Sequence, residues 1–259
     1  MEPSLLDMRR VSVMRGSKVV LRDFTLRIAD GEHVAILGPN GCGKSTLIKS
    51  VMRELYPLYD PQSSFTIFGR ETWNVFDLRP QLGIVSNDLM ALATRDVTGR
   101  ELILGGYFSS IEIMPWHDVT DEMRRHAAEV LETLEATHVA DRPLIELSSG
   151  EARRMLIARA LVHHPKALLF DEPSNSLDVF AQHELRQVLR KLAKAGIAIL
   201  LVTHHLADII PEIERVILMQ DGTIVADGPK SEILTEARLA EVFGLPVELT
   251  TRDGYYHLW

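Results

Sequence analysis

The sequence from residue 38 to residue 46 reads Gly38-Pro39-Asn40-Gly41-Cys42-Gly43-Lys44-Ser45-Thr46. An apolar run at residues 33–37 precedes it, and a run of helical character at residues 46–55 follows it. Strand, glycine loop and helix in this order match the phosphate-binding pattern GxxxxGK[ST]. The stretch therefore predicts that a nucleoside triphosphate binds here together with Mg²⁺.

Three glycines of this loop, Gly38, Gly41 and Gly43, are expected to adopt positive φ and to let the backbone approach phosphate oxygens closely. Successive N–H groups would point inward at the positive end of the following helix. The Lys44 ammonium adds a full charge, worth ~4 kcal/mol at ~4 Å and an effective dielectric of ~20, against ~0.3–2 kcal/mol for the helix dipole. We therefore expect Lys44 to dominate the anchoring of the β- and γ-phosphates, with the Ser45 hydroxyl as a Mg²⁺ ligand.

Composition restricts the possible partners and compartments. The chain has 259 residues, with 28 Lys and Arg against 36 Asp and Glu, and no basic cluster that would favour a nucleic-acid partner. Its single cysteine excludes an internal disulfide and fits a reducing, cytoplasmic compartment. The N-terminus lacks the pattern of a secretory signal. The longest apolar runs, such as residues 197–202, fall far short of the ~20 residues that a membrane helix needs, so any membrane role requires a partner.

Apolar runs and turn residues predict the order of the elements. Strands are expected at residues 5–8, 11–14, 18–21, 24–28, 33–37, 80–85, 167–170 and 197–202, and helices at residues 118–137, 151–162 and 179–195. Alternating strands and helices around a phosphate loop predict a parallel α/β core. The simplest organisation is one domain over residues 1–259, with a helical insertion at about residues 88–165.

Two adjacent acids, Asp171 and Glu172, follow the apolar run at residues 167–170. Carboxylates at the end of a buried strand are costly unless they face cations or water. Asp171 suits a Mg²⁺ ligand, direct or through water. Glu172 can act as the general base that takes a proton from the attacking water. An ordinary acidic turn is the structural alternative.

A second group of small residues, Ser148, Ser149 and Gly150, precedes the helix predicted at residues 151–162. A helix N-terminus of this kind can bind an anion, although Ser148 can equally serve only as the helix cap. His204 follows the strand predicted at residues 197–202. It is expected beside the carboxylates, where it could contact a γ-phosphate, although a histidine at a strand end is often structural.

In this order the motifs resemble those of the ATP-binding subunits of ABC transporters. The matching segments are the phosphate loop, residues 147–151, Phe170-Asp171-Glu172-Pro173, the turn at residues 175–178, and His204. The resemblance extends to residues 218–228, which look like the closing hairpin of that family. It implies a P-loop ATPase domain with a mixed or parallel sheet core, an N-terminal antiparallel β-subdomain and an inserted helical subdomain.

The resemblance further implies ATP hydrolysis in a head-to-tail dimer. Two ATP molecules would lie between two copies of the chain, with the phosphate loop of one copy facing Ser148, Ser149 and Gly150 of the other. Asp178 would belong to the same nucleotide site, and His204 would sense the γ-phosphate. ATP would close the dimer, and hydrolysis would loosen it.

Three positions depart from the family pattern. Ser149 stands where the signature usually has glycine, so either the backbone loses a close approach to phosphate or the serine hydroxyl binds the phosphate instead. Asn87 stands where the family has a glutamine, and its shorter side chain puts direct reach to Mg²⁺ or water in doubt. Arg15 aligns with the aromatic residue that stacks on adenine. Its guanidinium can stack on a base or can simply be solvated.

Cys42 lies inside the phosphate loop and has two interpretations. Its side chain is small enough to fit the loop, which is the simpler reading. The alternative is a thiol whose pKa is lowered by an electropositive nest, and this alternative predicts that ATP protects the chain from inhibition by alkylation.

Two functions fit these observations. The first is the ATPase subunit of a transporter, docked through residues 88–146 onto a separate permease at the cytoplasmic face of the inner membrane. The second is a cytosolic ABC ATPase without a permease that acts in assembly, repair or regulation. A permease recovered with the chain from solubilised membranes would distinguish the first from the second.

Overall fold

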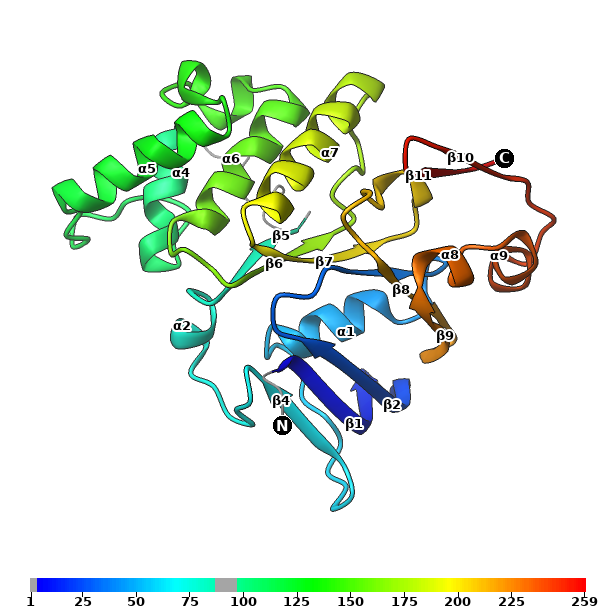
Figure 1. The fold of residues 1–259 in the computed structure, drawn as a ribbon. Helices are drawn as coiled ribbons and strands as arrows, with labels where there is room; N and C mark the ends of the chain where they lie inside the picture. The colour runs from blue at the N-terminus through cyan, green and yellow to red at the C-terminus, as the bar shows by residue number, and fades with distance from the viewer. Residues whose placement is uncertain (1–3, 87–96) are drawn as a thin grey trace. The chain divides into compact units, whose positions relative to one another are not determined.

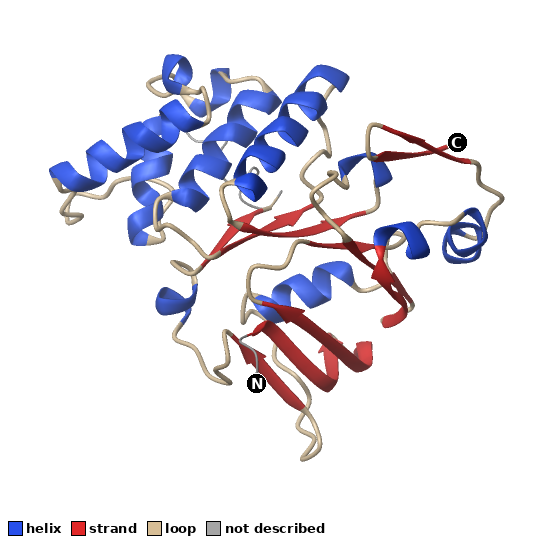
Figure 2. Ribbon diagram, in the orientation of Figure 1, coloured by secondary structure: helices blue, strands red, loops and turns tan. Residues whose placement is uncertain are grey.

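The computed structural model describes residues 4–86 and 97–259. The chain divides into two compact units, unit 1 with Met1–Val75 and Ala193–Trp259, and unit 2 with Phe76–Leu192. Figure 1 traces the elements in chain order, and Figure 2 separates helices from strands. The organisation as one domain with an insertion at about residues 88–165 stays a prediction.

Unit 1 begins with an antiparallel sheet of β1 (Ser4–Arg15), β2 (Lys18–Ala29) and β4 (Ser64–Ile67), in the order β2-β1-β4. The prediction of four short strands before residue 29 is wrong, because β1 and β2 are each continuous over 12 residues. The register of the pair shifts between Met8 and Val11. Arg10 adopts φ 51° and Asp23 φ 47°, so bulges absorb the polar residues that interrupt the apolar pattern.

A mixed set of strands forms the core of unit 1. β3 (Val34–Leu37) pairs in parallel with both β7 (Ala198–Thr203) and β8 (Arg215–Gln220), and β8 turns back into antiparallel β9 (Thr223–Pro229). The last pair confirms the predicted closing hairpin. Every residue of β3 and β7 is buried, which explains their uninterrupted apolar sequence. Helix α1 (Lys44–Val51) follows β3.

The remaining elements of unit 1 follow β7 and β9. They are η4 (Leu206–Asp208), α8 (Lys230–Ile233), α9 (Glu236–Phe243), β10 (Leu249–Arg252) and β11 (Tyr255–Leu258). β10 and β11 form an antiparallel hairpin. Thr235 caps α9 by accepting the N–H of Arg238, and Gly244 ends the helix in the left-handed conformation.

Unit 2 combines a parallel strand pair with helices. β5 (Leu82–Val85) pairs with β6 (Ala167–Asp171). The helical elements are α2 (Val75–Leu78), α4 (Gly99–Gly105), η1 (Gly106–Phe108), α5 (Asp121–Thr133), η2 (Thr137–Val139), η3 (Leu144–Glu146), α6 (Ser149–Leu161) and α7 (Val179–Lys194). Helix α5 is shorter than the predicted residues 118–137, because Thr120 caps its start and Glu135 turns left-handed after its end. α4, α5 and α6 pack against one another.

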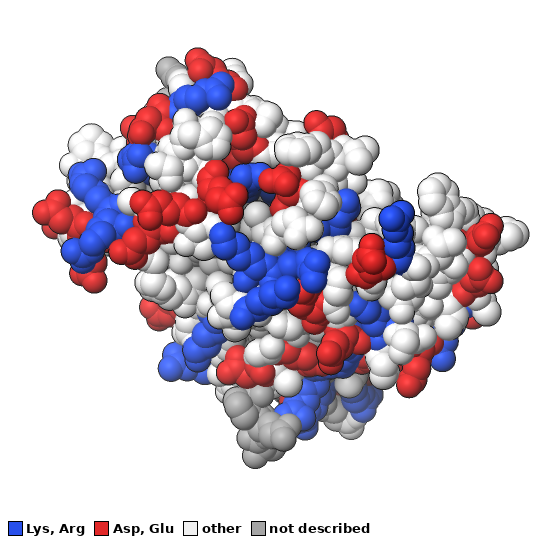
Figure 3. Space-filling model, turned by 45° about the horizontal axis from the view of Figure 1, so that its top comes forward, with Lys and Arg blue, Asp and Glu red and all other residues white. Residues whose placement is uncertain are grey.

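Charged side chains of both signs cover the surface. Figure 3 shows Lys and Arg interspersed with Asp and Glu over the helices of unit 2, and a group of basic side chains near the centre of the view. The formal net charge of the chain is −8. Within the described ranges, no helix is both long and apolar enough to cross a bilayer.

Candidate nucleotide-binding site

The phosphate loop connects the end of β3 to the start of α1 in unit 1. Gly41 and Gly43 have φ of 82° and 113°, as predicted. Gly38 is different, because it lies outside the positive-φ region. A Cβ on Gly38 would lie 2.4 Å from the carbonyl oxygen of Met219 on β8. Glycine is therefore needed at position 38 for close packing and not for its backbone angle.

Lys44 is only 6% exposed, and its ammonium is fixed by the loop itself. Nζ donates hydrogen bonds to the carbonyl oxygen of Gly38 at 2.6 Å and to that of Pro39 at 3.2 Å. The next residue, Ser45, is exposed, and Thr46 is buried. The loop thus presents a positioned cation next to an accessible hydroxyl, which suits a phosphate with a bound metal ion.

His204 lies at the same strand edge as the phosphate loop. In the parallel pair of β3 and β7, Leu37 is opposite Thr203, so Gly38 and His204 each come directly after the paired residues. The Thr203 hydroxyl accepts the N–H of His205 at 3.0 Å and donates to Asp208 at 3.1 Å. The rings of His204 and His205 lie with their centroids 3.9 Å apart and their planes tilted by 41°. The structure therefore brings together two parts of the predicted site.

Cys42 is 4% exposed. Burial raises the pKa of the Cys42 thiol above its ordinary value, and the charge of Lys44 offsets only part of that rise. The alternative of a lowered pKa is therefore wrong, because desolvation of the thiolate outweighs the positive surroundings. Cys42 instead fills space beside Gly38. A Cβ placed on Gly38 would lie 2.8 Å from the Cys42 Sγ.

Arg15 is the last residue of β1 and is exposed in the hairpin opposite Lys18. Stacking of Arg15 on adenine stays a prediction, with simple solvation as its alternative. Asn87 lies outside the described residues.

Unit 2 carries the two predicted carboxylates directly after a buried strand. β6 ends at Asp171, and Glu172 follows with φ 47° in the left-handed region. Both residues are half-buried. The carbonyl oxygen of Glu172 accepts the N–H of Asn175. The acids thus end a strand whose preceding four residues are fully buried, as the apolar run at residues 167–170 predicted.

Ser148 caps helix α6 in a reciprocal arrangement with Glu151. The Ser148 hydroxyl accepts the N–H of Glu151 at 3.3 Å and donates to its Oε2 at 2.7 Å, while the Ser148 N–H donates to the same oxygen at 2.8 Å. These hydrogen bonds hold the pKa of the Glu151 carboxyl below its usual range. The predicted cap is confirmed, and the role of Ser148 in anion binding stays a prediction.

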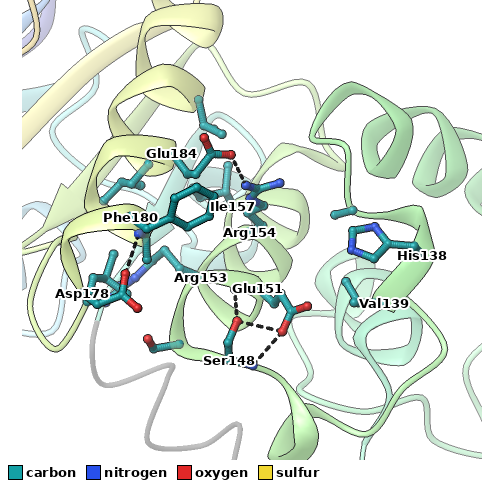
Figure 4. Close-up of a pocket in the computed structure, with 17 residues that line it drawn as sticks. His138, Val139, Ser148, Glu151, Arg153, Arg154, Ile157, Asp178, Phe180 and Glu184 are labelled. Atoms are coloured by element: carbon teal, nitrogen blue, oxygen red, sulfur yellow. Dashed lines mark hydrogen bonds and ion pairs between the residues drawn. The ribbon is translucent and has the colours of Figure 1, made fainter.

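A pocket of about 260 Å³ joins the start of α6 to the start of α7. Ser148, Ser149, Gly150 and Asp178 all line it, and Figure 4 shows Ser148 and Asp178 on opposite sides of Arg153. Asp178 accepts the N–H of Ala181 at 2.7 Å and so begins α7. The structure therefore brings these four predicted residues into one pocket of unit 2.

Sequence reasoning missed two residues of this pocket. Arg153 is 2% exposed and contributes a positive charge, and Phe180 is 73% exposed and presents its ring. The position of Arg153, two residues after the capping Glu151, could have indicated that it belongs to this pocket. No comparable signal marked Phe180, because exposure of an aromatic side chain follows from packing alone. Within the described ranges, no cluster of three or more His, Cys, Asp or Glu side chains is arranged to hold a metal.

The loop between β3 and α1, with its buried lysine and accessible hydroxyl, defines a nucleotide-binding protein of the P-loop class. The ABC transporter family model matches residues 21–175, which is more than half of the 259 residues. The chain therefore belongs to the ABC transporter family, with the fold of an ABC ATPase.

Three similar proteins illustrate the match. The hemin import ATP-binding protein HmuV of Aliivibrio fischeri is 32% identical, over 90% of this chain and 88% of that protein. The Fe(3+) ions import ATP-binding protein FbpC of Streptomyces coelicolor is 33% identical, over 90% of this chain and 64% of that protein. The dimeric ATP-binding cassette MJ0796, solved with ADP and Pi in a post-hydrolysis state, is 26% identical, with a TM-score of 0.69. The match covers 86% of this chain and 98% of that chain.

These findings confirm the predicted fold and activity. The chain is the ATP-binding subunit of an ABC transporter, and it hydrolyses ATP.

Proposed function

We propose that this chain drives the import of hemin or a related iron compound through a separate membrane permease. The observation that carries the proposal is its 32% identity, over nearly the full length of both chains, to a hemin import ATP-binding protein. The resemblance to an Fe(3+) import protein points to the same class of cargo. The permease would be engaged through residues 88–146 at the cytoplasmic face of the membrane.

The proposed chemistry gives each predicted site residue one role. The loop amides of residues 38–46 and Lys44 would hold the phosphates, and Ser45 and Asp171 would supply oxygen ligands to Mg²⁺, with Asn87 as a further candidate. Glu172 takes a proton from the attacking water, and His204 contacts the γ-phosphate. The exposed hydroxyl next to the buried Lys44 supports this assignment for Ser45.

We further propose that two copies of the chain act as a head-to-tail dimer. Ser148, Ser149, Gly150 and Asp178 would then meet the ATP bound to the phosphate loop of the other copy. Their presence in one pocket supports the proposal, as does the dimeric state of MJ0796. Each copy would be one domain, residues 1–259.

The test is Glu172→Gln. This variant should bind ATP normally, hydrolyse it about 10²–10⁴-fold more slowly, and elute as a dimer with ATP in size-exclusion chromatography. Glu146→Gln is the matched control, because Glu146 lies in the same unit and its carboxylate forms an exposed ion pair with Arg142. Hydrolysis by the Glu172 variant at the normal rate would contradict the assignment of the base.

The cargo is tested separately by affinity purification of the chain from solubilised membranes. A multi-helix permease should copurify, and hemin should stimulate ATP hydrolysis by the complex in liposomes. Recovery of the chain without a permease would contradict the importer and favour a cytosolic ATPase.

A further inference from the structure

Arg53 is a buried cation that has no acidic partner in the described part of the chain. It follows helix α1 in unit 1 and is 8% exposed. Its Nη2 donates to the carbonyl oxygen of Glu71 at 2.8 Å, and its guanidinium lies 4.2 Å from the centre of the Phe65 ring. Within the described ranges, no carboxylate forms an ion pair with it, and its Nε–H is enclosed without an acceptor. Buried charges in proteins are normally paired, so this group requires an explanation.

The backbone at Arg53 adds to the anomaly. Its φ of 60° lies in the left-handed region, where a residue with a Cβ is strained and glycine is favoured. Burial also lowers the pKa of the guanidinium, and only Tyr56 opposes that effect. The position therefore combines backbone strain with the desolvation of a charge, and no ion pair among the described residues offsets either.

Arg53 opens on a pocket of about 430 Å³, a size typical of small-molecule sites. Arg53 lines this pocket, and its hydrogen bonds within the described ranges involve Nη2 and not Nη1. Tyr56 and Trp73 contribute aromatic rings to the lining, and Ser63 and Ser64 contribute hydroxyl groups. The Trp73 indole is fixed by its hydrogen bond to the carbonyl oxygen of Ile67.

We propose that this pocket binds a small organic anion, with its carboxylate or phosphate on the Arg53 guanidinium and a flat ring against Tyr56 and Trp73. Arginine pairs strongly with both oxyanions, and aromatic side chains offer faces on which a ring can stack. The pocket follows the C-terminal end of α1, whereas the phosphate loop precedes its N-terminal end at Lys44. The ligand therefore occupies a site separate from that of the ATP phosphates.

Intrinsic fluorescence tests this directly. Trp116 and Trp259 are 76% and 77% exposed, so the double substitution W116F/W259F leaves Trp73 as the single tryptophan of the chain. The protein without nucleotide is titrated with benzoate, phenyl phosphate and benzyl alcohol. We expect a saturable change with at least one of the two anions, and none with the neutral alcohol. The preferred anion identifies the ligand as a carboxylate or a phosphate ester.

Two substitutions locate the effect. Arg53→Gln should weaken anion binding by about tenfold or more, because a charged hydrogen-bond partner is lost. Arg70→Gln is the matched control, since the Arg70 guanidinium lies 5.0 Å from the Trp73 ring but does not line the pocket. Its affinity should be unchanged.

If circular dichroism shows that Arg53→Gln does not fold, Tyr56→Ala decides, because Tyr56 is 67% exposed and its loss spares the core. This variant should weaken anion binding several-fold. Absence of a saturable anion response, an equal response to benzyl alcohol, or unchanged affinity in the folded Arg53 variant would overturn the proposal. If the Arg53 variant does not fold, unchanged anion affinity in the Tyr56 variant would also overturn the proposal. None of these readouts depends on ATP hydrolysis, so the proposal and the ATPase assignment can fail independently.

Discussion

The ammonium nitrogen of Lys44 lies 2.6 Å from the carbonyl oxygen of Gly38, the first residue of the loop that Lys44 ends. The loop therefore closes on its own cation and holds the charge in place. This arrangement makes Lys44 both a structural and an electrostatic part of the site. Gly38 must be small for a separate reason, because the loop packs closely against β8 at that point.

The raised pKa of Cys42 predicts slow alkylation. Its thiol deprotonates at a higher pH than an exposed cysteine, so the reactive thiolate is scarce at neutral pH. Mass spectrometry after iodoacetamide treatment at pH 7 should show much slower labelling of the folded chain than of the chain unfolded in urea. Because Cys42 is the only cysteine, the unfolded chain is its own control. Equal rates would contradict the burial of the thiol.

Ser148→Ala separates capping from nucleotide binding. The variant should lose about 1 kcal/mol of unfolding free energy, because the cap of α6 is removed. ATP hydrolysis should fall as well if Ser148 contacts ATP. Thr120→Ala is the matched control, because Thr120 caps α5 by accepting the N–H of Met123 but does not line the pocket.

Urea denaturation and ATPase assays on both variants check this prediction. Equal activity in the two variants, at equal loss of stability, would show that Ser148 is only a cap.

His33 predicts that stability falls in mild acid. Burial lowers the pKa of His33, and the carboxylates of Glu212 and Glu214 offset only part of this effect. Its Nδ1 accepts the N–H of Ile199 at 3.2 Å, which requires that nitrogen to be unprotonated. In the unfolded chain His33 has a pKa of about 6.5, and below that pH the unfolded chain binds a proton that the folded chain resists. The contribution of neutral His33 to the free energy of unfolding is therefore present above that pH and is lost as the pH falls.

Urea midpoints at several pH values between neutrality and mild acid measure this effect. His33→Gln is the comparison, because its amide oxygen can accept the same hydrogen bond without titrating. The variant should show a smaller loss of stability on acidification than the native chain. Parallel pH profiles would contradict the role of His33.

The elements nearest the site were predictable because their signals are local. β3 and β6 are buried apolar runs, and α6 begins with a serine and a glutamate in capping positions. The long strands β1 and β2 were divided wrongly, since a bulge at Arg10 can be recognised only from its pairing with the partner strand. β4 was missed because its four residues alternate too briefly to stand out.

The site residues also separate into those with local sequence signals and those that depend on distant contacts. The loop, the capping serine and the strand-end His204 could be read from order and spacing. The pKa of Cys42 and the close packing at Gly38 depend on what distant segments bring near them, and Met219 is such a neighbour. Arg53 could not be singled out either, because the sequence shows a cation but not its burial.

The most direct test of the account is the affinity of Lys44→Ala for ATP in the presence of Mg²⁺, measured by fluorescence titration. Loss of a charged hydrogen-bonding group should weaken binding about 10–100-fold. Lys49→Ala is the matched control, because Lys49 lies on the same helix and its ammonium pairs with Glu54 at 3.9 Å. The affinity of this variant for ATP should be unchanged. Native affinity in the Lys44 variant would contradict the assignment of this loop as the phosphate site.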